Sequence, residues 1–99
     1  MCSSDLAKRL NPASVGAHYN LGLALQELGK NREAAIEYAE ALRLNPDHAE
    51  AHNNLGAILY GEGKIREATA HFAAAVRLKS NYADALNNLK AAQQSSPVP

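Results

Sequence analysis

The stretch AHYNLG, residues 17–22, returns almost unchanged as AHNNLG, residues 51–56, and this repetition decides the fold. When residues 15–48 are aligned with residues 49–82, 15 of the 34 positions carry identical residues. A sequence period of about 20–50 residues is typical of repeat proteins. The sequence therefore predicts a chain built from repeated units.

The repetition continues at both ends of the aligned region. AKRLNP at 7–12 resembles ALRLNP at 41–46, and ADALNNL at 83–89 resembles AEAHNNL at 49–55. These matches divide the chain into a start at 1–6, the remnant of a preceding repeat helix at 7–14, repeats at 15–48 and 49–82, a capping helix at 83–94 and a tail at 95–99 that is expected to be disordered.

Each unit is predicted to contain two helices joined by a tight turn. Leu21, Leu25 and Leu28 recur at helical spacing in the first half of the unit. Gly29 suits the left-handed backbone that commonly follows a helix. Asn31 is expected to cap the second helix through its side-chain oxygen.

The end of each unit is marked by turn residues. Pro46 is expected to stop the second helix, because proline disfavours helical geometry in the residue before it. Asp47 and Glu50 then have the spacing of a capping box, with Asp47 as the cap. Strand signals are absent from the sequence, and a hairpin this small must stack on its neighbours to bury its apolar face.

A recognisable pattern of small and large residues runs through both units. It consists of Leu21, Gly22, Leu25, Ala34, Tyr38, Ala41 and Pro46, followed by Leu55, Gly56, Leu59, Ala68, Phe72 and Ala75. Over residues 7–94 the chain resembles the tetratricopeptide repeat family, whose unit is a 34-residue helix–turn–helix. The resemblance implies an all-α fold, an α-solenoid of stacked antiparallel helix hairpins: two full units, a leading half-helix and a C-terminal capping helix.

The resemblance also assigns packing roles. Gly22 is expected to be small so that a partner helix can approach closely, with Ala34 as the residue facing it. Tyr38 is expected to fill the space between stacked hairpins, and the counterparts 34 residues later should do the same. His18 and His52 occupy the position of the family's tryptophan, and both are expected to be partly buried.

The last repeat departs from the pattern. Lys90 stands where the earlier units have Gly22 and Gly56, so a close approach of helices is not expected there. Ser80 replaces the proline of Pro46. The helix at 83–94 is therefore predicted to be a polar cap, which a solenoid needs to stay soluble.

Composition excludes several classes of function. Ten basic and ten acidic residues balance, so no overall charge recruits nucleic acid or an anionic membrane surface. No apolar run approaches the roughly 20 residues that span a bilayer. The sequence therefore predicts that the protein binds no nucleic acid and makes no direct membrane contact, and a cytoplasmic location is expected.

The first six residues, MCSSDL, need a separate interpretation. They resemble the translation of a sequencing adapter, in which case they did not evolve with the protein and its natural sequence extends further upstream. The alternative is a genuine polar start that caps a short helix. Cys2, the single cysteine, cannot form an internal disulfide.

The residues that carry catalytic or metal chemistry do not form a recognisable motif. His48 and His52 lie four residues apart, but the zinc-protease motif needs glutamate directly after the first histidine, where this chain has Ala49. The glycines around Gly61 lack the spacing and the preceding strand of a phosphate loop. The sequence thus predicts structural histidines, no metal, no cofactor and no enzymatic activity.

What remains is a binding surface. In the family, the first helices of successive repeats line a concave groove that binds peptides or other proteins. By this resemblance the groove residues are Tyr19, Asn20, Leu23, Gln26, Asn53, Asn54, Ala57, Tyr60, Asn87 and Asn88. Asn20, Asn54 and Asn88 recur at one position of three first helices, and such a ladder of amides can hold a peptide backbone. The alternative is that these asparagines only bridge adjacent helices or water.

One known type of groove is not expected. Chaperone-binding members of the family grip a terminal carboxylate with lysine, arginine and asparagine. At the matching positions this chain has Tyr19, Leu23, Asp84 and Asn88 in place of the carboxylate-binding residues. Of those binding residues it keeps only one, the asparagine at Asn54. Asp84 adds a negative charge that repels a carboxylate.

The sequence thus predicts a non-catalytic protein–protein interaction module that binds an extended peptide or protein segment of unknown identity. An alternative is a C-terminal repeat fragment of a larger enzyme, such as a glycosyltransferase. A further alternative is weak self-association through the N-terminal edge of the repeats, where apolar residues lack a preceding unit.

Overall fold

The computed structural model describes residues 14–95, and this part of the chain is all-α, as predicted. Its helices are α2 (Ser14–Glu27), α3 (Asn31–Leu44), α4 (Ala49–Gly61), α5 (Ile65–Leu78) and α6 (Ala83–Ser95). Ser14 and Ser95, which the sequence places outside the repeats, begin α2 and end α6. The predicted start at 1–6 and the rest of the leading remnant and of the tail lie outside the described residues.

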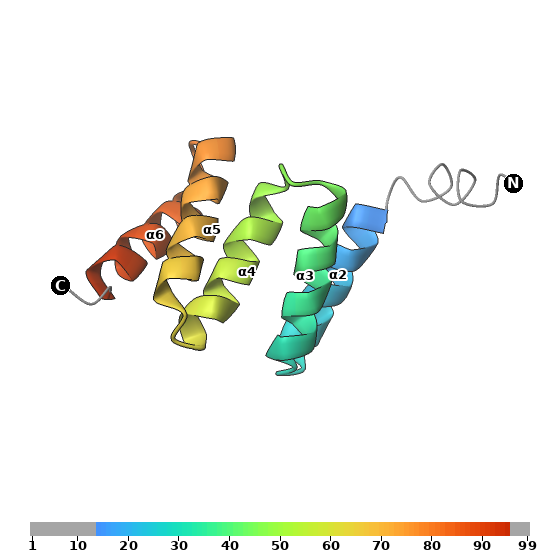
Figure 1. Cartoon of the computed structure of the whole chain (residues 1–99). Coiled ribbons are helices and arrows are strands. Elements are labelled where there is room, and N and C mark those ends of the chain that lie inside the picture. The colour runs from blue at the N-terminus through green and yellow to red at the C-terminus, as the bar shows by residue number, and fades with distance from the viewer. Residues whose placement is uncertain (1–13, 96–99) are drawn as a thin grey trace, which may run out of the picture.

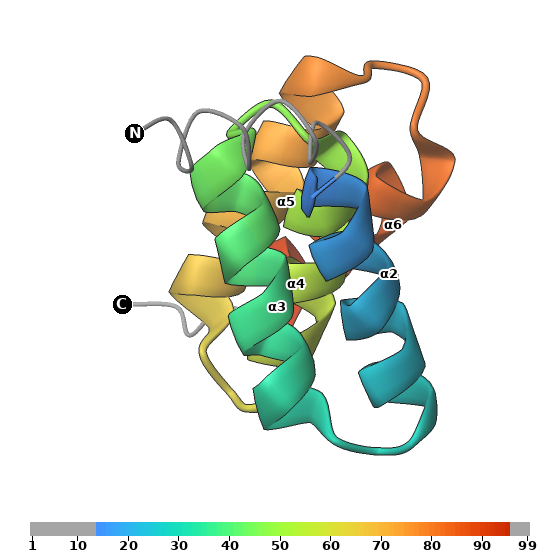
Figure 2. The same ribbon diagram turned by 90° about the vertical axis from the view of Figure 1, so that its right-hand side faces the viewer.

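The helices form stacked antiparallel hairpins. α2 pairs with α3, α4 pairs with α5, and α6 packs mainly on α5 (Figure 1). We call α2, α4 and α6 the first helices and α3 and α5 the second helices. Figure 2 shows α2 and α6 on one side of the molecule and α3 on the other. The arrangement confirms the predicted α-solenoid.

Two buried aromatic rings join successive hairpins. Tyr38 of α3 is fully buried and packs with Leu55 and Ile58 of α4. Phe72, at the same position of α5, packs with Ala92 of α6. These rings fill the space between hairpins, as the repeat pattern predicts.

The helical glycines accommodate these rings. A Cβ atom added to Gly22 would lie 2.6 Å from the ring of Tyr38, and one added to Gly56 would lie 2.7 Å from the ring of Phe72. The Cβ added to Gly56 would also lie 3.2 Å from the backbone oxygen of Ala68, the residue predicted to face it. In both hairpins the flat ring occupies the space that the missing side chain leaves.

The turns inside the hairpins contain the expected glycines, but the expected cap of α3 is wrong. Gly29 and Gly63 have φ angles of 81° and 85°, in the left-handed region that favours glycine. Asn31 is already the first helical residue of α3, and Lys30 takes the N-cap position without a side-chain capping bond. Because the helix begins one residue after Lys30, the Asn31 side chain cannot serve as the cap.

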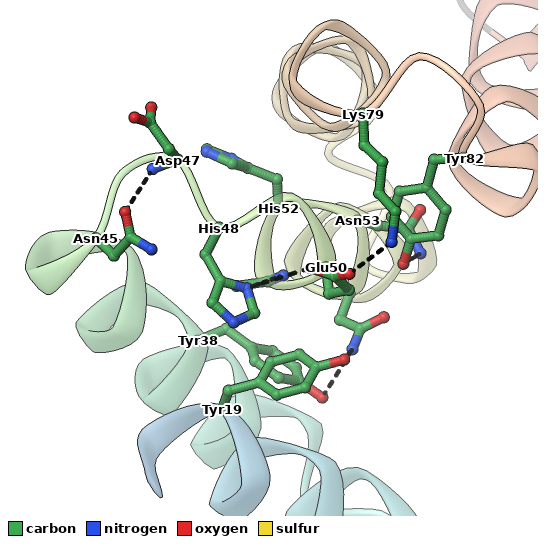
Figure 3. Close-up of polar contacts among 12 residues, drawn as sticks. Tyr19, Tyr38, Asn45, Asp47, His48, Glu50, His52, Asn53, Lys79 and Tyr82 are labelled. Atoms are coloured by element: carbon green, nitrogen blue, oxygen red, sulfur yellow. Dashed lines mark hydrogen bonds and ion pairs between the residues drawn. The ribbon is translucent and has the colours of Figure 1, made fainter. Parts of the chain in front are cut away.

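The predicted cap of α4 is also wrong by one residue. Asn45 Oδ1 accepts a hydrogen bond from the backbone N–H of Asp47, which closes a local turn. The helix therefore begins later, and His48 becomes its N-cap. His48 Nδ1 accepts from the N–H of Ala51 at 3.1 Å (Figure 3). The capping oxygen expected from Asp47 is thus replaced by an imidazole nitrogen.

The two edges of the solenoid differ in polarity. Leu21 exposes 47% of its surface, whereas Leu55, at the same position of the next unit, exposes 8% because α3 covers it. At the other edge Lys90 of α6 faces water, as predicted. No helix in the described part of the chain has the length and apolar character needed to cross a membrane.

Candidate peptide-binding groove

The predicted groove residues come mainly from two repeated positions of the first helices. Counting residues 15, 49 and 83 as the start of each unit, the fifth positions are Tyr19, Asn53 and Asn87, and the sixth positions are Asn20, Asn54 and Asn88. The helical repeat brings each position to the same face of α2, α4 and α6.

The structure separates the predicted residues by exposure. Asn20, Ala57 and Asn87 are exposed to solvent. Asn53 is buried, with 7% of its surface exposed. The remaining six are half-buried: Tyr19, Leu23, Gln26, Asn54, Tyr60 and Asn88.

A polar bridge connects α2 with α4. Asn54 Nδ2 donates to the Tyr19 hydroxyl at 3.3 Å and lies 3.5 Å from the Tyr38 hydroxyl. The Tyr38 hydroxyl in turn donates to Gln26 Oε1. The rings of Tyr19 and Tyr38 are close to each other, with 5.8 Å between their centroids (Figure 3). The bridge thus spans both helices of the first hairpin and the first helix of the second.

A matching bridge connects α4 with α6. Asn88 Nδ2 donates to Asn53 Oδ1 at 2.9 Å, and Asn53 Nδ2 donates to the Tyr82 hydroxyl at 3.4 Å. Asn88 and Asn54 therefore play the same role: each donates to the fifth-position residue of the preceding first helix, 35 residues earlier. The asparagines bridge adjacent helices at these two positions.

Part of the amide ladder remains open to a ligand. Within residues 14–95, Asn54 Oδ1 and Asn88 Oδ1 accept no hydrogen bond from the protein. No buried side-chain nitrogen or oxygen in this range lacks a partner, so both oxygens reach solvent. Contact between the ladder and a ligand stays a prediction, now centred on these oxygens and on exposed Asn20 and Asn87.

Sequence reasoning missed the residues at the hairpin junctions. His48 and Tyr82 are 34 residues apart, and each lies against the fifth-position residue 29 residues earlier: the His48 ring is 4.8 Å from the Tyr19 ring, and Tyr82 accepts from Asn53. The repeat period contained this signal, because any pair found at one junction recurs at the next.

An ion pair completes the second junction. Lys79 Nζ lies 2.9 Å from Glu50 Oε2 and 5.1 Å from the centroid of the Tyr82 ring (Figure 3). The hydrogen bond from Lys79 lowers the pKa of Glu50, and burial raises the pKa of Tyr82. At neutral pH this junction therefore combines a neutral phenol with a paired carboxylate.

The phenols of the first junction are also held neutral. Burial raises the pKa of Tyr38 to about 12 and also raises the pKa of Tyr19. The hydrogen bond from Asn54 lowers the pKa of both phenols, but this effect is smaller than that of burial. Both phenols of the first junction thus act as neutral hydrogen-bonding groups.

Other surface features lie away from the asparagines. Two clefts flank the hairpin turns, the first lined by Gly63, Lys64, Ile65, Arg66 and Glu67, the second by Arg32, Ala35, Leu59, Glu62 and Lys64. In the part of the chain that the structure describes, no group of three or more His, Cys, Asp or Glu side chains is placed to hold a metal ion.

Comparison with known proteins gives one finding. The family model described as Tetratricopeptide repeat matches residues 19–83, which is well over half of the chain. A search of curated proteins finds no match. The matched region runs from within α2 to the first residue of α6 and contains the turn glycines and the aromatic rings that join successive units. The chain therefore belongs to the tetratricopeptide repeat family.

Proposed function

We propose that this chain is a non-catalytic interaction module that binds an extended peptide or protein segment along α2, α4 and α6. Tetratricopeptide repeats generally mediate protein–protein interaction. The observation that supports the proposal most is the pair of equivalent bridges, Asn54 to Tyr19 and Asn88 to Asn53. They tie the first helices together and leave polar atoms directed to solvent.

The bridges favour binding because they fix the spacing of the helices before a ligand arrives. A surface that is already ordered loses little conformational entropy on association. Asn20 and Asn87 add exposed amides at the two ends of this surface. An amide both donates and accepts hydrogen bonds, which matches the alternating donors and acceptors of a peptide backbone.

The centre of the surface carries a small, uncharged side chain. Ala57 is exposed on α4, between the levels of Asn54 and Tyr60, and leaves room for a main chain to approach. The neighbouring charges, Lys79 and Glu50, neutralise each other. The proposed ligand is therefore a segment recognised through its backbone and neutral side chains.

A peptide-display selection tests the proposal. Random 12-residue peptides are selected against the folded protein, and the affinities of the enriched peptides are measured for wild type, Ala57→Glu and Ala70→Glu. Both alanines are exposed, but Ala57 lies on first helix α4 and Ala70 on second helix α5. We expect Ala57→Glu to weaken binding at least about tenfold, equivalent to about 1.4 kcal/mol. Ala70→Glu should leave it unchanged.

Two results would contradict the proposal. Equal affinities for the two glutamate variants would place binding elsewhere, and a selection that enriches no peptide would argue against a peptide groove. Asn20→Ala and Asn87→Ala refine the test, because both amides are exposed and neither bridges described helices. A loss of affinity in these variants supports direct contact with the ladder.

Self-association is a second candidate, favoured by the contrast between Leu21 and Leu55. The preceding hairpin covers Leu55, whereas Leu21 is nearly half exposed. A second copy that presents the same apolar edge would bury both in a symmetric dimer. Sedimentation should show a concentration-dependent dimer that Leu21→Glu abolishes. Leu86→Glu, at an exposed leucine of α6, should not affect it.

The alternative of a repeat region within a larger enzyme also remains a proposal. In that case a further repeat would cover the edge around Leu21, and this chain would contribute binding rather than chemistry. The genomic sequence upstream of residue 1 tests it directly: an open reading frame that continues into further repeats supports the alternative, and a start site at this position removes it.

A further inference from the structure

One interhelical polar pair occurs in both hairpins, but with different chemistry. In the first hairpin, His18 Nδ1 of α2 lies 2.7 Å from Glu37 Oε1 of α3. In the second, His52 Nδ1 of α4 lies 3.0 Å from His71 Nδ1 of α5. His52 and His71 follow their counterparts by 34 residues each, so His71 occupies the place of Glu37.

The surroundings determine which nitrogen carries hydrogen in the histidine pair. His52 Nε2 lies 2.8 Å from the carbonyl oxygen of Pro46, which can only accept a hydrogen bond. His52 Nε2 therefore carries a hydrogen, and in the neutral ring Nδ1 is an acceptor. His71 Nδ1 must then carry the hydrogen that bridges the two rings.

This pair tolerates one extra proton but not two. If His71 is protonated at Nε2, its Nδ1–H still donates to His52. If both rings are charged, each Nδ1 carries a hydrogen, and two donors and two like charges face each other at 3.0 Å. In the first hairpin the carboxylate of Glu37 only accepts, so His18 donates to it in either charge state.

The charges around His71 give the sign of the pH effect. Burial is the largest cause that lowers the pKa of His71 below its ordinary value of 6.5, and His52 of α4 lowers it further. Glu67, one turn earlier on α5, acts in the opposite direction. Since folded His71 binds a proton less readily than unfolded His71, stability falls as the pH falls below about 6.5.

Charged groups on the other packed elements have partners or face water. Glu37 pairs with His18 and Glu40 with Arg43 on α3, Glu50 pairs with Lys79 across α4 and α5, and Asp84 and Lys90 of α6 are exposed.

We propose that the His52–His71 pair makes the second hairpin acid-sensitive, so that acidification loosens the contact between α4 and α5. The first hairpin, with Glu37 in the equivalent place, keeps its interhelical bond under the same conditions. Acid thus acts on one of two repeats that share the same fold but differ at this pair. This regulation is independent of which ligand occupies the groove.

The tautomers provide a direct test of the geometry. Long-range ¹H–¹⁵N spectra of the intact protein at pH 7.5 should show His52 protonated at Nε2 and His71 protonated at Nδ1. If both rings carry their hydrogen on Nε2, the bond between the Nδ1 atoms does not exist and the proposal is wrong. This measurement needs no variant.

Thermal melting tests the consequence. The drop in Tm between pH 7.5 and pH 5.0 is measured, with EDTA present, for wild type, His71→Gln and Glu37→Gln. We expect His71→Gln to shrink the drop by about 4 °C or more, because its side chain does not titrate. Glu37→Gln, at the equivalent position, should not shrink it. His52→Gln serves as a second variant if His71→Gln does not fold. An equal drop in wild type and in the folded histidine variants would overturn the proposal.

Discussion

Asn88 donates a hydrogen bond to Asn53 across two first helices, with 2.9 Å between Nδ2 and Oδ1. Asn54 stands in the same relation to Tyr19, one repeat earlier. The recurrence shows that the sixth-position asparagine ties α4 to α2 and α6 to α4. The asparagines therefore contribute to the stacking of the solenoid whether or not they also contact a ligand.

The bridge from Asn88 to Asn53 predicts that alanine substitutions at Asn53 and Asn87, which share the fifth position of the repeat, differ in their effect on stability. Asn53 is buried and uses both ends of its amide, whereas Asn87 is exposed. We expect Asn53→Ala to lower the free energy of unfolding by about 1–3 kcal/mol, because it leaves the groups of Asn88 and Tyr82 without partners. Asn87→Ala should change it by less than about 0.5 kcal/mol. Urea denaturation measures both; equal effects would contradict the bridging role.

The helical glycines predict an effect opposite to helix propensity. Alanine forms helices better than glycine by up to about 1 kcal/mol. A Cβ at Gly56 would nevertheless lie 2.7 Å from the buried ring of Phe72, and overpacking of this kind costs about 1–3 kcal/mol. We expect Gly56→Ala to lower Tm. Gly16→Ala should keep or raise it, because the added Cβ would have no described atom within 4 Å apart from its chain neighbours and the nearby backbone of its own helix. A stabilised Gly56→Ala variant would show that the ring moves aside freely.

The buried phenol of Tyr38 predicts a loss of stability in alkali. Its pKa is raised from 10.0 to about 12 in the folded chain, mainly by burial. The neutral form is thus favoured by folding, and this stabilisation is complete below pH 10 and is lost as the pH rises through about 12. We expect Tyr38→Phe to flatten the decline of stability between pH 10 and 12. Absorbance at the wavelength of tyrosinate, followed with far-ultraviolet circular dichroism, measures ionisation and unfolding together.

The groove should not bind acidic C-terminal peptides of the kind that chaperone-binding members of the family recognise. Asp84 is exposed at one matching position, and Lys79 is paired with Glu50. Like charges repel the terminal carboxylate. Calorimetric titration with such a peptide should give a Kd weaker than about 1 mM. The same peptide with an amidated C-terminus is the control, and micromolar binding of the free carboxylate alone would contradict the prediction.

Local chemistry made much of the fold predictable. The turn glycines Gly29 and Gly63 and the helical spacing of the leucines each depend on residues near one another in sequence, and the 34-residue period repeats these local signals. The caps were predicted less well. Asn31 and Asp47 have good capping side chains, but the start of a helix depends on the turn that precedes it. At α4 that turn is closed by Asn45, which shifts the cap to His48.

The candidate groove was likewise predictable from the sequence only in part. Its positions followed from the repeat, because equivalent residues of equivalent helices share a face. Which amides are used in bridges and which reach solvent depends on partners 29 and 35 residues away, outside the helix that carries the amide. Exposure of Leu21 and burial of Leu55 likewise depend on the neighbouring hairpin rather than on the leucines themselves.

The sequence by itself determined the helical hairpins, their number within the repeated region and the order of stacking, since periodic apolar residues and turn glycines act over a few residues. Only the tertiary structure decided that His71 meets His52 while Glu37 meets His18. The members of each pair are 19 residues apart in sequence, and they meet only because the two helices of a hairpin pack against each other. The packing of the helices therefore turns the change from Glu37 to His71 at one repeat position into a difference in chemistry between the two hairpins.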